Sequence, residues 1–173
     1  GAGTLLIALT DGTLVWDNAA GDFQWSAATP LPPMLKGRFG AEPNAVVDRV
    51  RGLDPLAVIR GNHDKAACGI EDGSNFNQVA RLAAVWTHET LTPDNRQYLK
   101  ALPAGPEAID EHLEICHGSP FDEDHYIFDG EDALRALSTS VRPLCIFAHT
   151  HLPVVFHYEN ESFDGFVPQA DED

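Results

Sequence analysis

The sequence predicts a single domain with a layered α/β fold. Short apolar runs of strand length alternate with longer segments of helical periodicity, which is the pattern of α/β proteins. Loops rich in His, Asn or Asp directly follow several of the predicted strands. The length of 173 residues suits one domain, and a hydrophobic fraction of 43% is that of a globular protein. We therefore expect one domain over residues 1–173.

The first third of the chain predicts two strands and one helix. Thr4–Leu9 is apolar and predicts a buried strand that ends in a turn. Leu14–Lys36 shows neither helix nor strand periodicity, so no element is assigned there, although the stretch is long for a loop inside a compact domain. Pro43 and the apolar stripe after it predict a helix up to Gly52. Leu56–Ile59 predicts a short buried strand.

The remainder alternates helices and strands. Thr92 followed by Pro93 is a helix start, with an N-cap residue and Pro at the first helical position. Trp86 shares one side of its predicted helix with other apolar residues, so we expect it in the core. The predicted helices are Phe76–His88, the segment from Pro93 to just before Pro103, and Glu131–Leu137. The predicted strands are His112–Cys116, Leu144–Phe147 and Val154–Tyr158.

Charge and cysteine content limit the partners and the compartment. A net charge of −16 without a basic stripe disfavours binding to duplex nucleic acid, because that binding depends on Lys and Arg at the phosphates. The sequence has no run of about 20 apolar residues and no signal-peptide pattern. Three cysteines without CxxC spacing predict free thiols in a reducing cytoplasm, and Cys116 and Cys145, each in an apolar run, are expected to be buried. The oligomeric state is left open.

Three polar clusters point to a metal site. They are Arg60-Gly61-Asn62-His63-Asp64, His117-Gly118-Ser119-Pro120 and His149-Thr150-His151, and each follows a predicted strand. In α/β folds, sites are built at the carboxyl ends of strands. Imidazole nitrogens with amide or carboxylate oxygens suit divalent Mn, with Fe, Zn, Ni or Co as alternatives. The two glycines would permit close approach of backbone and ligand.

These clusters resemble the motifs of the calcineurin-like metallophosphoesterases, in particular the small bacterial and archaeal phosphodiesterases. GNHD at 61–64, HGSP at 117–120 and FAHTHLP at 147–153 stand in that family's order and approximate spacing. The resemblance runs from about Phe39 to Pro153 and leaves residues 1–36 divergent and 170–173 as an acidic tail. It implies an α/β/β/α sandwich of two mixed sheets flanked by helices. We expect the sandwich to be incomplete at both ends.

The resemblance also implies residue roles. His63 would contact the phosphate of a small phosphoester substrate and protonate the leaving oxygen, and Asp64 would orient His63. A second metal ion would be held by Asn62, His117 and His149, and a first ion by His151 and Asp11. Two such ions can activate a hydroxide between them and clamp the phosphoryl oxygens.

Two carboxylate motifs of the family are missing. The family's Asp-x-His is replaced by Thr10-Asp11-Gly12-Thr13, which retains only the Asp, and Met34-Leu35 stands where the metal-bridging Gly-Asp is expected. Without the bridging carboxylate two cations would repel each other. We therefore expect at most one well-bound ion, with catalysis weak or lost. A shifted reading frame over the N-terminal part is one hypothesis for this divergence.

Three functions remain open. The first is metal-dependent hydrolysis of phosphoesters, as a phosphodiesterase or phosphatase. The second is a degenerate relative that binds a metal or a phosphorylated ligand without turnover, and the third is an interaction protein whose histidines are incidental. The acidic run Asp122-Glu123-Asp124 is expected to be a solvated loop, with tuning of the site as the alternative.

Overall fold

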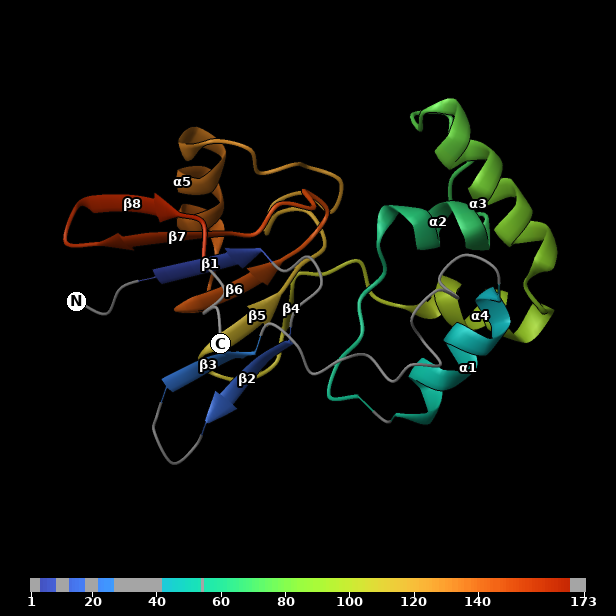
Figure 1. Cartoon of the computed structure of the whole chain (residues 1–173), viewed down its shortest axis with the longest axis horizontal. Coiled ribbons are helices and arrows are strands. Elements are labelled where there is room, and N and C mark those ends of the chain that lie inside the picture. The colour runs from blue at the N-terminus through green and yellow to red at the C-terminus, as the bar shows by residue number, and fades with distance from the viewer. Residues whose placement is uncertain (1–3, 9–12, 18–21, 27–41, 54, 169–173) are drawn as a thin grey trace.

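The computed structural model describes residues 4–8, 13–17, 22–26, 42–53 and 55–168. Within them a mixed sheet lies beside a group of four helices, and a fifth helix covers the sheet (Figure 1). The helices are α1 (Pro43–Gly52), α2 (Asn62–Cys68), α3 (Gln78–Thr90), α4 (Pro93–Ala101) and α5 (Gly130–Thr139). The strands are β1 (Thr4–Ala8), β2 (Thr13–Asp17), β3 (Asp22–Ser26), β4 (Glu107–Ala108), β5 (Leu113–Ile115), β6 (Leu144–Phe147), β7 (Val154–Glu159) and β8 (Ser162–Phe166).

The sheet has a parallel centre. Its strand order is β4-β5-β6-β1-β7-β8, in which β5, β6 and β1 run parallel and the outer strands pair antiparallel. The carboxyl ends of β5 and β6 therefore meet at one edge, and His117 and His149 follow them there. The prediction of a mixed α/β fold is confirmed, whereas the four-layer sandwich stays a prediction.

Two apolar clusters form the core of the described part. One lies between α5 and the sheet and includes Cys116, Cys145 and Phe147; the other joins the helices around Val47 and Leu99. All three cysteines are free and buried; burial was expected for Cys116 and Cys145 but not for Cys68. No described helix is long and apolar enough to cross a membrane.

Most predicted elements are present, but the strand at Leu56–Ile59 is wrong. This segment has no strand partner among the described residues, Leu56 is 96% exposed, and a strand without a neighbour leaves its hydrogen-bonding groups unpaired. The residue that follows this segment, Arg60, is held by a hydrogen bond outside any sheet: its backbone N–H donates to the Pro103 carbonyl at 2.9 Å.

The stretch from 14 to 36, to which no element was assigned, contains two paired strands. β2 and β3 form an antiparallel hairpin within this stretch, with Leu14 opposite Trp25 and Trp16 opposite Phe23. Aromatic and β-branched residues favour this pairing. Residues 27–36 lie outside the described part.

Candidate functional site

The first part of the candidate site joins the end of β5 to the start of α2. His117 Nε2 donates a hydrogen bond to Asn62 Oδ1 at 3.0 Å, across 55 residues of sequence. The carbonyl of His117 accepts from the Ala148 amide at 2.9 Å, which ties this loop to the end of β6. His117 thus contacts the side chain of Asn62 in the first motif and the backbone of the third motif at Ala148.

His149 adds the third motif. It is 6% exposed and adopts a left-handed backbone with φ of 60°, which turns the chain sharply after β6. Its ring centroid lies 4.8 Å from that of His117 and 3.8 Å from that of Tyr126. Its Nε2 donates to the backbone carbonyl of Asp124 at 3.1 Å, which leaves Nδ1 as the free lone pair of the neutral ring.

Two glycines leave room for these close contacts, whereas the close approach of a ligand that was expected at them stays a prediction. A Cβ at Gly61 would lie 2.7 to 3.1 Å from ring atoms of His117, and one at Gly118 would lie 2.7 to 2.9 Å from backbone atoms of Glu123 and His125. Both contacts are closer than a Cβ tolerates, so these positions leave room for the His117 ring and for the loop after β5.

Burial keeps the two histidines neutral. It lowers the pKa of His117 to about 4, assisted by the nearby His149, His151 and His63 and opposed by Asp124. Burial likewise lowers the pKa of His149, against the raising effect of Asp124. Neutral imidazoles are the form that binds metal ions.

The remaining motif residues surround this pair. His63 is exposed, with its ring 4.7 Å from that of Phe76. Asp64 Oδ2 accepts from the Gly61 amide at 2.8 Å and caps α2, and burial raises the pKa of its carboxyl. His151 is exposed, with a left-handed φ of 58°. No hydrogen bond between Asp64 and His63 is found among the described residues, so the orienting role stays a prediction.

Asp11 lies outside the described residues, as does the Met34-Leu35 position. β1, which precedes Asp11, ends at the same edge as β6, since Ala8 is paired with Phe147 in a parallel register. The strand that leads to the Asp-x-His position is therefore next to the strand that leads to His149.

The donor set fits one metal ion in part. Within the described ranges, no three His, Cys, Asp or Glu side chains are close enough to form a metal-binding group. Asn62 is not of those types, however, and its Oδ1 lies 3.0 Å from His117 Nε2. Two ligands of one ion at about 2.1 Å are roughly 3 to 3.5 Å apart, so these two atoms have a suitable separation for the tautomer of His117 that carries its proton on Nδ1 and leaves Nε2 free to bind.

The acidic run 122–124 is partly the solvated loop that was expected, because Asp122 and Asp124 are exposed, but Glu123 and Asp124 also bond to α2. Glu123 and Asp124 both accept hydrogen bonds from the Lys65 ammonium, and Glu123 also accepts from Arg60. Burial lowers the pKa of Lys65, but its bonds to Asp124 and Glu71 outweigh this and raise the pKa overall. Neither Lys65 nor Tyr126 belongs to one of the three motifs, so no signal in the sequence pointed to them.

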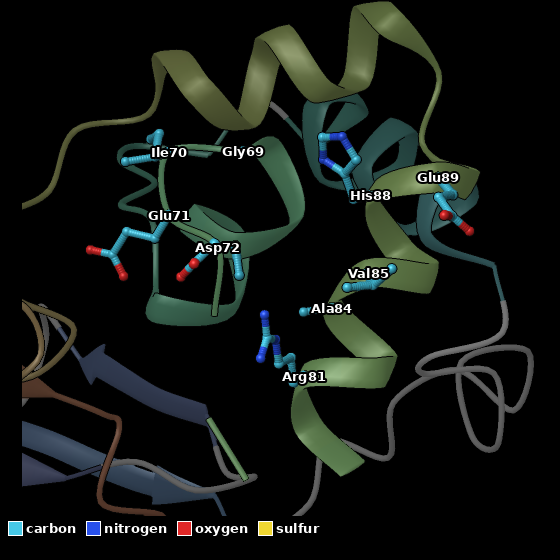
Figure 2. Close-up of a pocket in the computed structure, with 10 residues that line it drawn as sticks. Gly69, Ile70, Glu71, Asp72, Arg81, Ala84, Val85, His88 and Glu89 are labelled. Atoms are coloured by element: carbon cyan, nitrogen blue, oxygen red, sulfur yellow. The ribbon is translucent and has the colours of Figure 1, made fainter. Parts of the chain in front are cut away.

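Among the described residues, one smaller and one larger hollow lie near α2. The smaller, of about 200 Å³, is at the site and is lined by Asn62, Glu71, Asn75, Phe76, Asp124, Tyr126 and His149. The larger, of about 590 Å³, lies between the end of α2 and α3 and contains none of the predicted site residues (Figure 2). Arg81 and Asp72 both line it, and Arg81 helps to lower the pKa of Asp72, after the hydrogen bonds from Ser74. Its charges are therefore mixed.

Comparison with known proteins places the chain beside a solved metallophosphoesterase. The chain is 37% identical to a metallophosphoesterase from Sphaerobacter thermophilus of known crystal structure, over 65% of this chain and 45% of that one, with a TM-score of 0.54. It is 28% identical over 122 residues to an uncharacterized protein of Methanocaldococcus jannaschii, covering 68% of this chain and 48% of that protein. A third match, 38% identical over 80 residues, is an NAD(+) hydrolase of an Actinoplanes species, of which it covers 10%.

The chain thus spans about half the length of the first two relatives. No family model matches it. The solved neighbour is a metallophosphoesterase, and this supports a calcineurin-like fold and a phosphoesterase class.

Proposed function

We propose that the chain binds one divalent metal ion through Asn62, His117 and His149 and hydrolyses phosphoesters. The observation that carries the proposal is the 3.0 Å approach of His117 Nε2 to Asn62 Oδ1, with the His149 ring beside them. The similarity to a metallophosphoesterase supports the same class of reaction. His151 and Asp11 remain candidate ligands for a further ion.

The chemistry of the proposed site follows from its donors. Asn62, His117 and His149 would hold a divalent ion, which would supply positive charge at a phosphoryl oxygen and attraction for an anionic ester in a protein of net charge −16. His149 is oriented for this purpose by its hydrogen bond to the Asp124 carbonyl, an arrangement typical of metal-binding histidines. Manganese is the first ion to test, followed by iron, zinc, nickel and cobalt.

The proposed substrate-side groups lie at the start of α2. His63 is exposed there and is the proposed proton donor to the leaving oxygen, and Asp64 is proposed to hold the turn that presents it. The substrate is proposed to be a small phosphoester.

Binding without turnover is the second candidate. It is favoured by the absence, within the described residues, of a three-member group of His, Cys, Asp and Glu, and by the missing Asp-x-His and Gly-Asp motifs. In that case a metal or a phosphorylated ligand would bind without being hydrolysed.

The test uses metal-stripped protein with a chromogenic phosphodiester and a monoester, with and without Mn²⁺. His149→Ala removes a proposed ligand, and His112→Ala is the matched control because the His112 side chain is 73% exposed. Mn²⁺-dependent turnover that is lost only in His149→Ala supports hydrolysis. Mn²⁺ binding without turnover in folded protein supports the second candidate, and absence of both contradicts the proposal.

A further inference from the structure

Lys65 is a buried cation that the proposed reaction does not use. Its side chain is 1% exposed, and its Nζ donates to Glu71 Oε1 at 2.9 Å, to Glu123 Oε1 at 3.4 Å and to Asp124 Oδ2. Three carboxylates from two separate segments therefore converge on one ammonium group.

These bonds join α2, which carries Asn62, to the loop after β5, which contacts His149. Lys65 lies on α2 one turn after Asn62, whereas Asp124 lies in the loop after β5 and its backbone carbonyl accepts from His149. Arg60 makes the same connection from the other side, because its guanidinium donates to both carboxylate oxygens of Glu123 at 3.1 Å. Arg60 and Lys65 thus stand on either side of the 61–64 motif in the chain. Both bond to Glu123, and Lys65 also bonds to Asp124.

We infer that Lys65 is a positioning residue: its ammonium holds α2 against the 122–126 loop and so sets Asn62 and His149 beside His117. The inference rests on the proposed metal site. Asp124 is bonded to Lys65 through its carboxylate and to His149 through its backbone carbonyl. A shift of Asp124 on loss of the Lys65 bond would therefore also shift the hydrogen-bond partner of the His149 imidazole.

Energetics favour a positioning role over a purely stabilising one. Burying an ammonium group is costly, and well-packed apolar groups often replace buried ion pairs without loss of stability. A cation at this position does, however, select one relative placement of α2 and the loop, since all three carboxylates have to face it.

The first test compares Lys65→Met with Lys100→Met in the full chain. Met retains most of the buried volume, and Lys100 is an exposed lysine in the last turn of α4, which makes it the matched control. Circular dichroism and thermal unfolding identify folded variants, and titration calorimetry measures Mn²⁺ affinity. Lys65→Met is expected to bind Mn²⁺ about tenfold or more weakly, in the range for residues that orient metal ligands. Lys65→Arg is expected to recover part of this loss.

The second readout needs no metal. In the wild type, ring protons of Tyr126 and His149 should give nuclear Overhauser contacts, because their centroids are 3.8 Å apart. These contacts should weaken in Lys65→Met and persist in Lys100→Met. If Lys65→Met does not fold, Asp124→Asn replaces it, since that side chain is 44% exposed and the substitution keeps the backbone carbonyl.

The outcomes separate the two claims. A folded Lys65→Met with wild-type Mn²⁺ affinity and unchanged Tyr126–His149 contacts overturns the positioning role and leaves the proposed function standing. A wild type that binds no Mn²⁺ contradicts the proposed function, and the ring contacts then decide the role of Lys65.

Discussion

Gly61→Ala is the most direct perturbation of the candidate site. The added Cβ would lie 2.7 Å from Cε1 of His117, 3.0 Å from Nδ1 and 3.1 Å from Nε2. Gly61 has an extended backbone with φ of −106°, which alanine adopts without strain, so the substitution acts through the contact with His117. Ordinary van der Waals contact begins at 3.4 Å, and the shortfall at Cε1 is 0.7 Å. The ring therefore has to move by about that distance.

Such a displacement would break the hydrogen bond to Asn62. A movement of about 1 Å in a site can cost about a hundredfold in rate. We expect Mn²⁺ affinity to fall by about tenfold to a hundredfold, with a cost of about 1 kcal/mol or less in unfolding free energy at the helix start.

Titration calorimetry with Mn²⁺ and chemical denaturation measure the two effects of Gly61→Ala. Gly52→Ala is the matched control, because nothing lies within 4 Å of its Cβ position, and it should bind as the wild type does. Wild-type affinity in a folded Gly61→Ala would refute the argument that His117 needs this space.

Three further predictions concern stability and can be measured by denaturant or thermal unfolding. Gly118→Ala should cost about 2 kcal/mol or more, because its Cβ would press on backbone atoms of Glu123 and His125, which cannot rotate away; a loss under 0.5 kcal/mol would contradict this. Thr92→Ala should cost about 1 kcal/mol, since its hydroxyl caps α4, and Thr92→Ser should retain most of the stability. Burial acts to raise the pKa of Glu123, but Arg60 and Lys65 hold it below its ordinary 4.5. Its stabilisation is therefore present above about pH 4.5 and lost on further acidification, and Glu123→Gln should flatten that part of the stability curve.

Local signals in the sequence were sufficient for several elements. Pro43 and Gly52 bound α1 as predicted, and the Thr92-Pro93 pair begins α4, with the Thr92 hydroxyl accepting from the Asn95 amide. In these cases the residues that decide the structure are neighbours in the chain. Capping and proline geometry act within one turn and need no knowledge of the rest of the fold.

Predictions failed where the deciding partner is distant. Leu56–Ile59 has the composition of a buried strand but no neighbouring strand in the described part, so composition alone was misleading. Trp86 was expected in the core, yet it is 42% exposed and Val79 on the same helix is 77% exposed, while Ala84 is buried. The side of α3 that is buried is the side that packs against α2, whose small residues allow the two helices to come close. The hydrophobic periodicity of α3 alone does not predict which side that is.

The same distinction explains what could be learned of the site. Asn62, His117 and His149 stand in contiguous motifs, so their grouping could be predicted although their contacts could not. Lys65 lies 58 and 59 residues from its partners Glu123 and Asp124, and the acidic run has the composition of a solvated loop. The carboxylates of the acidic run meet Lys65 only because the fold brings the loop after β5 against α2. A carboxylate interacts more strongly with a buried ammonium group than with one in water. The proposed metal ligands could therefore be predicted from the sequence. Lys65, which we infer sets their geometry, could not.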